Sequence, residues 1–310
     1  MPETTETSPK FRTDFEPCHG KAVEVAPGIA RIVANNPSPF TFHGTNTYIL
    51  GAGRTVAVID PGPDHDDHLD TIERALVGRV VSHIVVTHTH VDHSPLAARL
   101  KAATGARTYA EGPHRPARPL RLGEVNPLDA SADEDFRPDV TLADGAVIEG
   151  EGWRLTALHT PGHTANHCAF ACEMNGERTL FSGDHVMAWA TSIVAPPDGS
   201  MSDYMASLDR MTARDETVYW PGHGPRLENA PAFVRALRAH RIMRERAVLE
   251  QVRAGRETVP AMVAIIYATT DKRLHAAAGL SVLAHLEDLV ARGLVEADGP
   301  VSLEARYRAG

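Results

Sequence analysis

The sequence predicts an α+β fold, in which a β-rich sandwich with helices is followed by a smaller helical module. Three observations lead to this prediction. Short apolar and β-branched runs, separated by Gly, Asn and Pro turns, occupy the first two thirds of the 310-residue chain. Stretches with helical spacing lie between some of these runs. Beyond about residue 227 the pattern changes to long helical stretches that end in a strand–turn–strand pattern.

The β-rich part opens with three strand-like runs, Ile29–Val33, Thr47–Leu50 and Thr55–Ile59. Residues His68–Leu76 then have helical spacing. The run Val80–Thr87 is continuously apolar, which is typical of a strand buried on both faces.

A helix is expected next, with Ser94 as its N-cap, Pro95 at its first position and Gly105 as its end. Residues Pro113–Asp139 hold five prolines and few apolar residues in period, so they are expected to form a long loop. The remaining strands and one helix are expected at Arg154–Leu158, Cys168–Cys172, Arg178–Phe181, Asp203–Ala213 (the helix) and Thr217–Trp220.

The C-terminal part reads as helices followed by a hairpin. Pro231–Arg253 and Thr258–Tyr267 are expected to be helices. Asp271–Ala278 and Ser281–Arg292 are expected to be a helix-turn-helix pair hinged at Gly279. Leu294–Glu296 and Val301–Tyr307 are expected to pair as a hairpin, which makes a winged-helix-like module. The expected domains are a flexible tail at 1–20, a catalytic domain at 21–227 and the winged-helix-like domain at 228–310.

Composition restricts the class of protein. A 43% apolar and 23% charged chain can bury a core, and its net charge of −9 argues against a DNA-coating protein. Neither an 18-residue apolar run nor a signal-like N-terminus is evident, so no membrane partner and a cytoplasmic location are expected. The three cysteines, Cys18, Cys168 and Cys172, argue against a disulfide framework. Cys168 and Cys172 share strand parity with Phe170 and are expected in the core.

The densest chemical signal is the loop His88-Thr-His90-Val-Asp92-His93, directly after the expected buried strand. Imidazole nitrogen and carboxylate oxygen are ligands of zinc and similar ions. Four such residues in six positions therefore predict a metal site.

Three further ligand-type residues, His163, Asp184 and His223, each lie on a Gly-containing turn that follows an expected strand. Five histidines and two aspartates at one edge of the sandwich are enough for two ions. Two ions about 3.5–4 Å apart can share a water and lower its pKa toward about 7. The resulting hydroxide attacks a carbonyl carbon or a phosphorus, and Asp92 is a candidate for proton transfer.

Three residues are weaker candidates for supporting roles. Asp60 ends a strand beside the expected site, where a carboxylate can orient a ligating imidazole, although a turn Asp before Pro-Gly is an equal alternative. His185 either approaches substrate or fills the space around Asp184. Asn46 either lines the cleft or belongs to a tight hairpin.

The motifs HTHVDH, TPGHT, SGDH and PGHG resemble the successive ligand motifs of the metallo-β-lactamase superfamily over about residues 20–227. The resemblance implies a four-layer αβ/βα sandwich. It also implies that one metal is held by His88, His90 and His163, that a second is held by Asp92, His93 and His223, and that Asp184 bridges them. Two zinc ions are expected on this ground, with manganese or iron as alternatives.

A closer resemblance, to the lactamase-beta-like protein 2 family, extends over nearly the whole chain. It is carried by segments such as Gly44-Thr-Asn-Thr-Tyr48, LFSGDHVM and His240-Arg241. That family includes an animal single-strand endoribonuclease, and related fungal proteins hydrolyse acyl-carrier thioesters. A β-lactamase role is disfavoured, because class B enzymes are exported and lack a bridging carboxylate here.

Three functions follow as hypotheses. The leading one is phosphodiester hydrolysis of single-stranded RNA, for which Arg235, Arg238 and Arg241 would form a basic stripe on one helix. Residues 228–310 hold 12 Lys and Arg against 10 Asp and Glu, a net +2, while the first 227 residues carry −11. The alternative is hydrolysis of a small-molecule or carrier-bound thioester or ester. The third is a winged-helix binding module with a vestigial metal site. A homodimer is left open.

Overall fold

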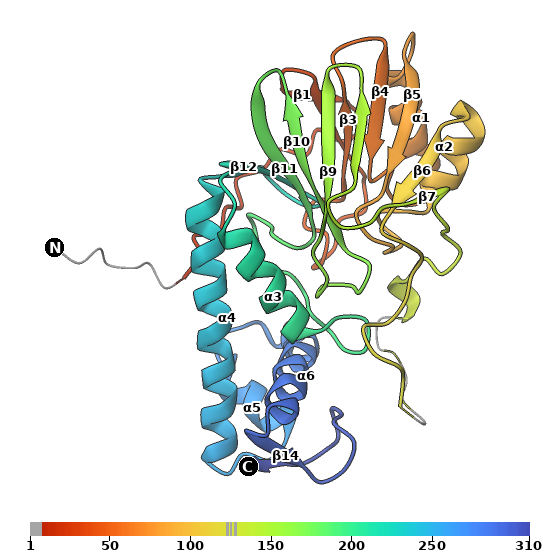
Figure 1. Cartoon of the computed structure of the whole chain (residues 1–310). Helices are drawn as coiled ribbons and strands as arrows, with labels where there is room; N and C mark the ends of the chain where they lie inside the picture. The colour runs from red at the N-terminus through yellow and green to blue at the C-terminus, as the bar shows by residue number, and fades with distance from the viewer. Residues whose placement is uncertain (1–7, 122–123, 125, 127–128) are drawn as a thin grey trace, which may run out of the picture.

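Two β-sheets lie face to face between helices, and a helical module packs at one end of this sandwich (Figure 1). The computed structural model describes residues 8–121, 124, 126 and 129–310. The predicted α+β class and the four-layer αβ/βα arrangement are confirmed.

Within the described ranges, the first sheet has seven strands in sequence order, antiparallel up to β4 and parallel from there on. Its strands are β1 (Val23–Ala26), β2 (Ile29–Val33), β3 (Asn46–Leu50), β4 (Thr55–Ile59), β5 (Val80–Val85), β6 (Arg107–Ala110) and β7 (Val140–Thr141). The crossovers from β4 to β5 and from β5 to β6 are the helices α1 (Asp66–Ala75) and α2 (Leu96–Thr104). These helices cover the outer face of the sheet.

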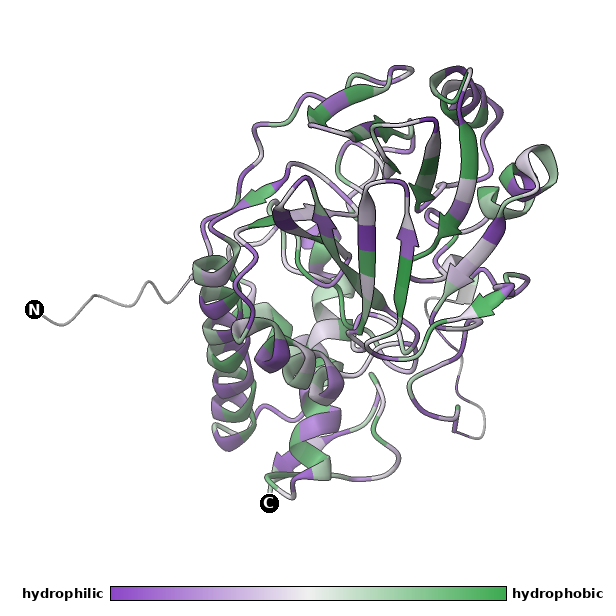
Figure 2. Cartoon of the chain, turned by 45° about the horizontal axis from the view of Figure 1, so that its top comes forward, coloured by the Kyte–Doolittle hydropathy of each residue, from purple (hydrophilic) through white to green (hydrophobic). Residues whose placement is uncertain are grey.

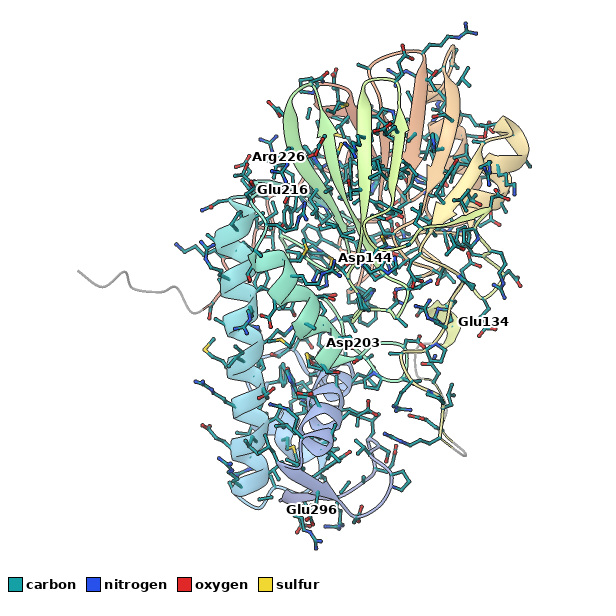
Figure 3. All side chains as sticks on the ribbon, viewed as in Figure 1. Glu134, Asp144, Asp203, Glu216, Arg226 and Glu296 are labelled. Atoms are coloured by element: carbon teal, nitrogen blue, oxygen red, sulfur yellow. The ribbon has the colours of Figure 1, made fainter. Side chains whose placement is uncertain are left out.

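The second sheet, as far as the chain is described, has six strands in the order β13-β12-β11-β10-β9-β8. Its strands are β8 (Val147–Gly150), β9 (Trp153–His159), β10 (Cys168–Met174), β11 (Glu177–Gly183), β12 (Val218–Pro221) and β13 (Leu227–Glu228). Of these six described strands, β11 and β12 pair in parallel and the others antiparallel, and α3 (Met201–Thr212) makes the parallel crossover. Figure 3 shows Asp144 between the sandwich and α3; its carboxylate accepts two bonds from Arg210 of α3.

Alternation along the strands separates two cores. Tyr48 and Leu50 of β3 point between the sheets, whereas Ile49 packs against α1 and α2. Cys168 and Cys172 lie between the sheets with Phe170, so the expectation that they pack in the core is confirmed.

The long helix α4 (Ala230–Arg253), which carries both hydrophilic and hydrophobic residues along its length (Figure 2), belongs to two cores. Its first half, through Leu237, packs with α3 against the second sheet. Its second half, through Val248 and Val252, packs into the C-terminal module. That module consists of α5 (Val259–Ile266), α6 (His275–Ala291) and a hairpin of β14 (Val295–Ala297) and β15 (Tyr307–Ala309). Two short 3-10 turns, Asp129–Ser131 and Lys272–Leu274, complete the described elements.

The expected hinge at Gly279 is wrong, because α6 runs unbroken through Gly279 and Ser281. A glycine within a helix costs about 1 kcal/mol relative to alanine. Burial of α6 side chains such as Val282 and Leu286 in the C-terminal core offsets that cost. At Gly279 the helix also comes close to α5, since an added Cβ would lie 3.6 Å from Val259 Cγ1.

Two local expectations at the N-terminal side also fail. The Ser94 hydroxyl donates to Asp133 Oδ2 instead of capping α2. Residues 8–20 are not a free tail, because Phe11 meets Phe233 edge-on at 6.0 Å and the Arg12 N–H donates to Ala188 O. The first seven residues of the expected tail, and 122–123, 125 and 127–128 of the expected long loop, lie outside the described residues.

Among the described residues, one helical stretch, Lys272–Ala291, is long and apolar enough to cross a membrane by length and composition. This is weak evidence, because a core helix passes the same test. Here Val282, Leu283, Leu286 and Leu289 are buried in the C-terminal core.

Stability should fall on acidification because of His285. Burial lowers the pKa of this α6 imidazole to about 3, and the nearby Arg241 cation adds to the effect. The unfolded chain binds this proton below about 6.5, whereas the folded one does not, so stability drops between these values by up to about 1.4 kcal/mol per pH unit. The variant H285L should therefore show a shallower fall of melting temperature from pH 7 to 5. The partly exposed His275→Gln is the control, and equal slopes for H285L and wild type would contradict the assignment.

Candidate metal centre

Asp60, which directly follows β4, holds the ligand loop His88–His93 in place after β5. Asp60 Oδ1 accepts the Thr87 N–H at 2.7 Å, and Oδ2 accepts the Thr87 hydroxyl at 2.7 Å. The same Oδ2 accepts the Nδ1–H of His93 at 3.0 Å. The structure therefore places Asp60 where the supporting role requires it.

One group of donor atoms consists of three buried imidazoles, His88, His90 and His163. His90 Nδ1 lies 3.1 Å from His88 Nε2 and 3.0 Å from His163 Nε2. Ligands about 2.1 Å from one tetrahedral ion would lie roughly 3.4 Å apart. These three nitrogens could therefore hold one ion.

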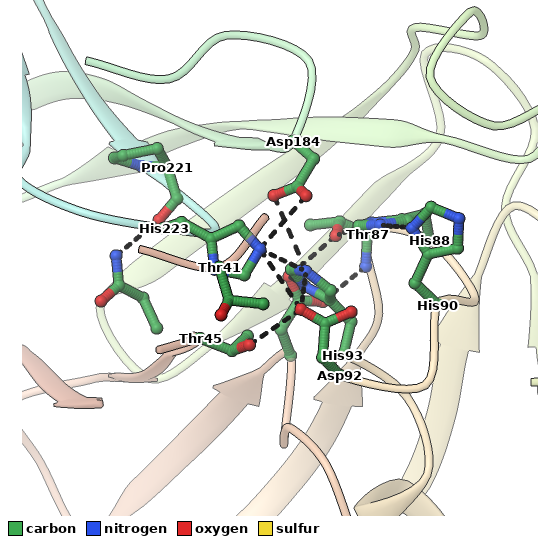
Figure 4. A network of polar contacts seen from close by, with 12 residues as sticks. Thr41, Thr45, Thr87, His88, His90, Asp92, His93, Asp184, Pro221 and His223 are labelled. Carbon is green, nitrogen blue, oxygen red and sulfur yellow. Dashed lines mark hydrogen bonds and ion pairs between the residues drawn. The ribbon is translucent and has the colours of Figure 1, made fainter. Parts of the chain in front are cut away.

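The second group consists of Asp92, His93 and His223 (Figure 4). His93 Nε2 lies 3.4 Å from both His223 Nε2 and Asp92 Oδ2. The Asp184 carboxylate lies between the two groups: its Oδ2 is 3.7 Å from His163 Nε2 and 3.2 Å from His223 Nε2, and its Oδ1 is 3.6 Å from His93 Nε2. All seven residues predicted as ligands thus converge on one place.

The backbone fixes which ring nitrogen faces the cluster. His163 Nδ1 bonds to Ile193 O at 2.6 Å, and His223 Nδ1 bonds to Gly44 O at 3.2 Å. A carbonyl can only accept, so each Nδ1 carries the proton and each Nε2 lone pair points into the cluster. His93 is oriented in the same way by Asp60.

The charge states of Asp184 and His90 also suit a bound cation. Burial disfavours the charged form of Asp184, but His223 and His93 hold the pKa of its carboxyl well below the usual range. Burial, with His163 beside it, lowers the pKa of His90 to about 3 and keeps that ring neutral. Carboxylate and neutral imidazole are the ligating forms.

One partnerless atom gives a direct test of fit. Asp184 Oδ1, which lies 3.6 Å from His93 Nε2, is buried and has no hydrogen-bond partner in the described part of the chain. Carboxylate oxygens and imidazoles without sulfur suit zinc, manganese or iron. The donor set therefore fits a metal site.

The two other supporting candidates lie away from the cleft. Asn46 donates to Pro221 O and Gly224 O, so it holds the turn that carries His223. His185 is fully buried and lies 4.8 Å from the Tyr204 ring, with neither ring nitrogen bonded among the described residues. It fills the space behind Asp184, and it does not line the cleft.

Two supporting residues escaped sequence reasoning. Thr45 donates to Asp92 Oδ2 at 2.9 Å, and the only signal for it was its place in the Gly-Thr-Asn-Thr turn. Gly222 carries no side chain because none fits: a Cβ there would lie 2.3 Å from Asp184 Oδ1 and 2.7 Å from His93 Cε1. Its position before a ligand histidine in PGHG was a usable signal.

The predicted basic stripe does not exist. Arg235 is exposed, Arg238 is ion-paired with Asp209, and Arg241 is buried with 3% exposure. None of the three lines the cleft above the cluster.

An apolar cleft of about 610 Å³ opens on the donor cluster. It lies between the sandwich and the C-terminal module. Its lining residues are Ser38, Phe40, Thr41, His90, Val91, Asp92, Ser131, His163, Asp184, Met187, Ile193, His223, Ala276, Ala277, Leu280 and Leu303. No Lys or Arg is among these described residues.

The sandwich and its edge cluster of His and Asp define a class of protein, the metal-dependent hydrolases. A family model described as metallo-beta-lactamase superfamily matches residues 40–223, and one described as beta-lactamase associated winged helix domain matches residues 258–301. The chain belongs to the metallo-beta-lactamase superfamily, as its motifs predicted.

Its relatives cover nearly the whole chain. It is 31% identical to an atrochrysone carboxyl ACP thioesterase of Passalora fulva, over 91% of this chain and 80% of that one. It is 28% identical to a beta-lactamase-like protein 2 homolog of Caenorhabditis elegans, over 90% of each. A beta-lactamase domain protein from Burkholderia ambifaria has the same fold, with a TM-score of 0.75 at 22% identity over 96% of each chain.

A side chain at position 222 should weaken metal binding. The variant G222A forces a methyl group against Asp184 and His93, so zinc affinity should fall at least tenfold. Equilibrium dialysis followed by elemental analysis measures it. Gly299→Ala, where an added Cβ meets nothing within 4 Å, is the matched control. Wild-type zinc affinity in a folded G222A protein would show that the donor geometry is misassigned.

Proposed function

We propose that the protein is a dinuclear metal-dependent thioester hydrolase acting on an acyl group bound in the apolar cleft. The observation that carries this proposal is the lining of the cleft, which places apolar side chains such as Phe40, Met187 and Leu280 beside the donor cluster. An acyl chain gains about 25 cal/mol for each Å² that it buries there.

Two relatives support the choice of substrate class. The Passalora fulva relative and one from Paecilomyces divaricatus, 29% identical, are both named as acyl-carrier thioesterases. A thioester suits a cleft without lining cations, because its acyl part is neutral. Its thiolate is also a good leaving group, which does not need a general acid to protonate it.

RNA hydrolysis, the leading hypothesis from sequence, has less support. Phosphate contacts from Lys and Arg dominate RNA affinity. The described lining of the cleft offers none, and Arg241 is buried. A vestigial metal site is also disfavoured, because all seven donor residues converge.

The chain's residues have separate roles in this proposal. His88, His90 and His163 would hold one ion, Asp92, His93 and His223 a second, and Asp184 would bridge them. When bound, the ions supply Lewis acidity and an activated water.

Asp92 is the proposed proton carrier. Its side chain is 20% exposed to the cleft, against 8% for Asp184. The Thr45 hydroxyl donates to Asp92 Oδ2 and thereby fixes the direction of the carboxylate.

The proposal predicts thiol release from acyl-CoA substrates by zinc-loaded protein, and no cleavage of labelled single-stranded RNA. The variant D184A should lose at least a thousandfold in kcat/KM, because it removes the residue between the two groups. Cleavage of RNA that depends on Asp184, without thiol release, would reverse the choice between the two substrates.

The α6 side of the cleft should set acyl size. Ala276 and Ala277 leave space that a larger side chain would fill. The variant A277F should raise KM for octanoyl-CoA about tenfold or more, while acetyl-CoA is hydrolysed as by wild type. Ala291→Phe, at the exposed end of α6, is the control. Equal effects of A277F on both substrates would exclude an acyl site against α6.

A further inference from the structure

Arg241 of α4 is a buried cation without a carboxylate partner. It is 3% exposed, and no ion pair joins it to an acidic group in the described part of the chain. Its guanidinium carbon lies 4.9 Å from the centre of the Tyr204 ring, and its Nη2 donates to the carbonyl oxygen of Ser192. Burying a charge is costly unless it is bonded, and Arg241 Nε has no hydrogen-bond partner among the described residues. The Ser192 carbonyl and the Tyr204 ring are therefore the contacts that compensate this cation.

The segment that Arg241 contacts also holds two of the metal-site residues. The Ser192 hydroxyl donates to the backbone carbonyl of Asp184. The carbonyl of the next residue, Ile193, accepts the Nδ1–H of His163 at 2.6 Å. One short segment, Ser192–Ile193, therefore fixes the backbone of one ligand and the ring of another.

Tyr204 strengthens the same connection. Its ring packs under the Arg241 guanidinium, and its hydroxyl donates to the carbonyl oxygen of His185 at 2.8 Å. His185 directly follows Asp184. Both contacts of Arg241 thus lead to the turn that carries the bridging carboxylate.

We infer that Arg241 is a positioning residue of the metal centre, which couples α4 to the ring of His163 and the backbone of Asp184 through Ser192–Ile193. The inference rests on the proposed metal-holding role of this cluster. Arg241 neither pairs with a carboxylate among the described residues nor lines the cleft, and this inference gives the buried cation a role.

The chain supplies a matched control one turn along the same helix. Arg244 donates to Ile266 O at 3.3 Å and lies 4.7 Å from the Tyr267 ring centre. It makes the same two kinds of contact, a carbonyl and a tyrosine ring, but within the C-terminal module. A loss that reflects only helix packing should therefore affect both variants alike.

The test measures zinc affinity of the whole chain by competition with a chelator, alongside circular dichroism and melting temperature. R241M should bind zinc 10–100-fold more weakly than wild type, and R244M should bind it as wild type does. R241K, which keeps the charge but loses the planar fork, should fall between R241M and wild type.

Wild-type zinc affinity in folded R241M would overturn the inference, as would an equal loss in R244M. If R241M does not fold, R241K decides: weaker zinc binding supports the inference, and unchanged binding overturns it. Failure of the wild-type protein to bind zinc would instead refute the metal-holding role itself.

Discussion

The buried carboxylate of Asp60 is the interaction on which the ligand site depends. It joins the end of β4 to the start of the ligand loop through the backbone and hydroxyl of Thr87, and to the ring of His93. A charge that is 2% exposed needs these three donors, and the loop in turn needs the acceptor. Because β4 and β5 are parallel neighbours, their carboxyl ends meet at the edge where this exchange occurs. The same edge receives the turns that carry His163, Asp184 and His223.

The cleft is built by both parts of the chain, the sandwich and the C-terminal module. The sandwich supplies every donor atom of the cluster, whereas Ala276, Ala277, Leu280 and Leu303 come from the module and form one wall of the cleft. The helix α4 contributes side chains to both cores and so connects the part that holds the donors with the module that forms the wall. We therefore assign the chemistry to the sandwich and the selection of substrate shape to its interface with the module.

The donor residues could be predicted from sequence because both of their patterns are local: His88, His90, Asp92 and His93 crowd one loop after a strand, and His163, Asp184 and His223 each follow a strand on a glycine-containing turn. The prediction of an arginine stripe was wrong, because three residues advance a helix by about 300° and two such steps carry a side chain about 120° around the axis. Arg235 therefore faces solvent while Arg241 reaches the core. The predicted hinge at Gly279 was wrong because burial of neighbouring α6 side chains outweighs the low helix propensity of glycine. The cleft wall depends on how distant segments pack, for which a single sequence holds no signal.

The most direct test of the account is anomalous diffraction at the zinc absorption edge from crystals of the zinc-loaded protein. Two peaks are expected, one among His88, His90 and His163 and the other among Asp92, His93 and His223, with the Asp184 carboxylate between them. A single peak, or two peaks that leave either group of donors without an ion, would contradict the dinuclear centre.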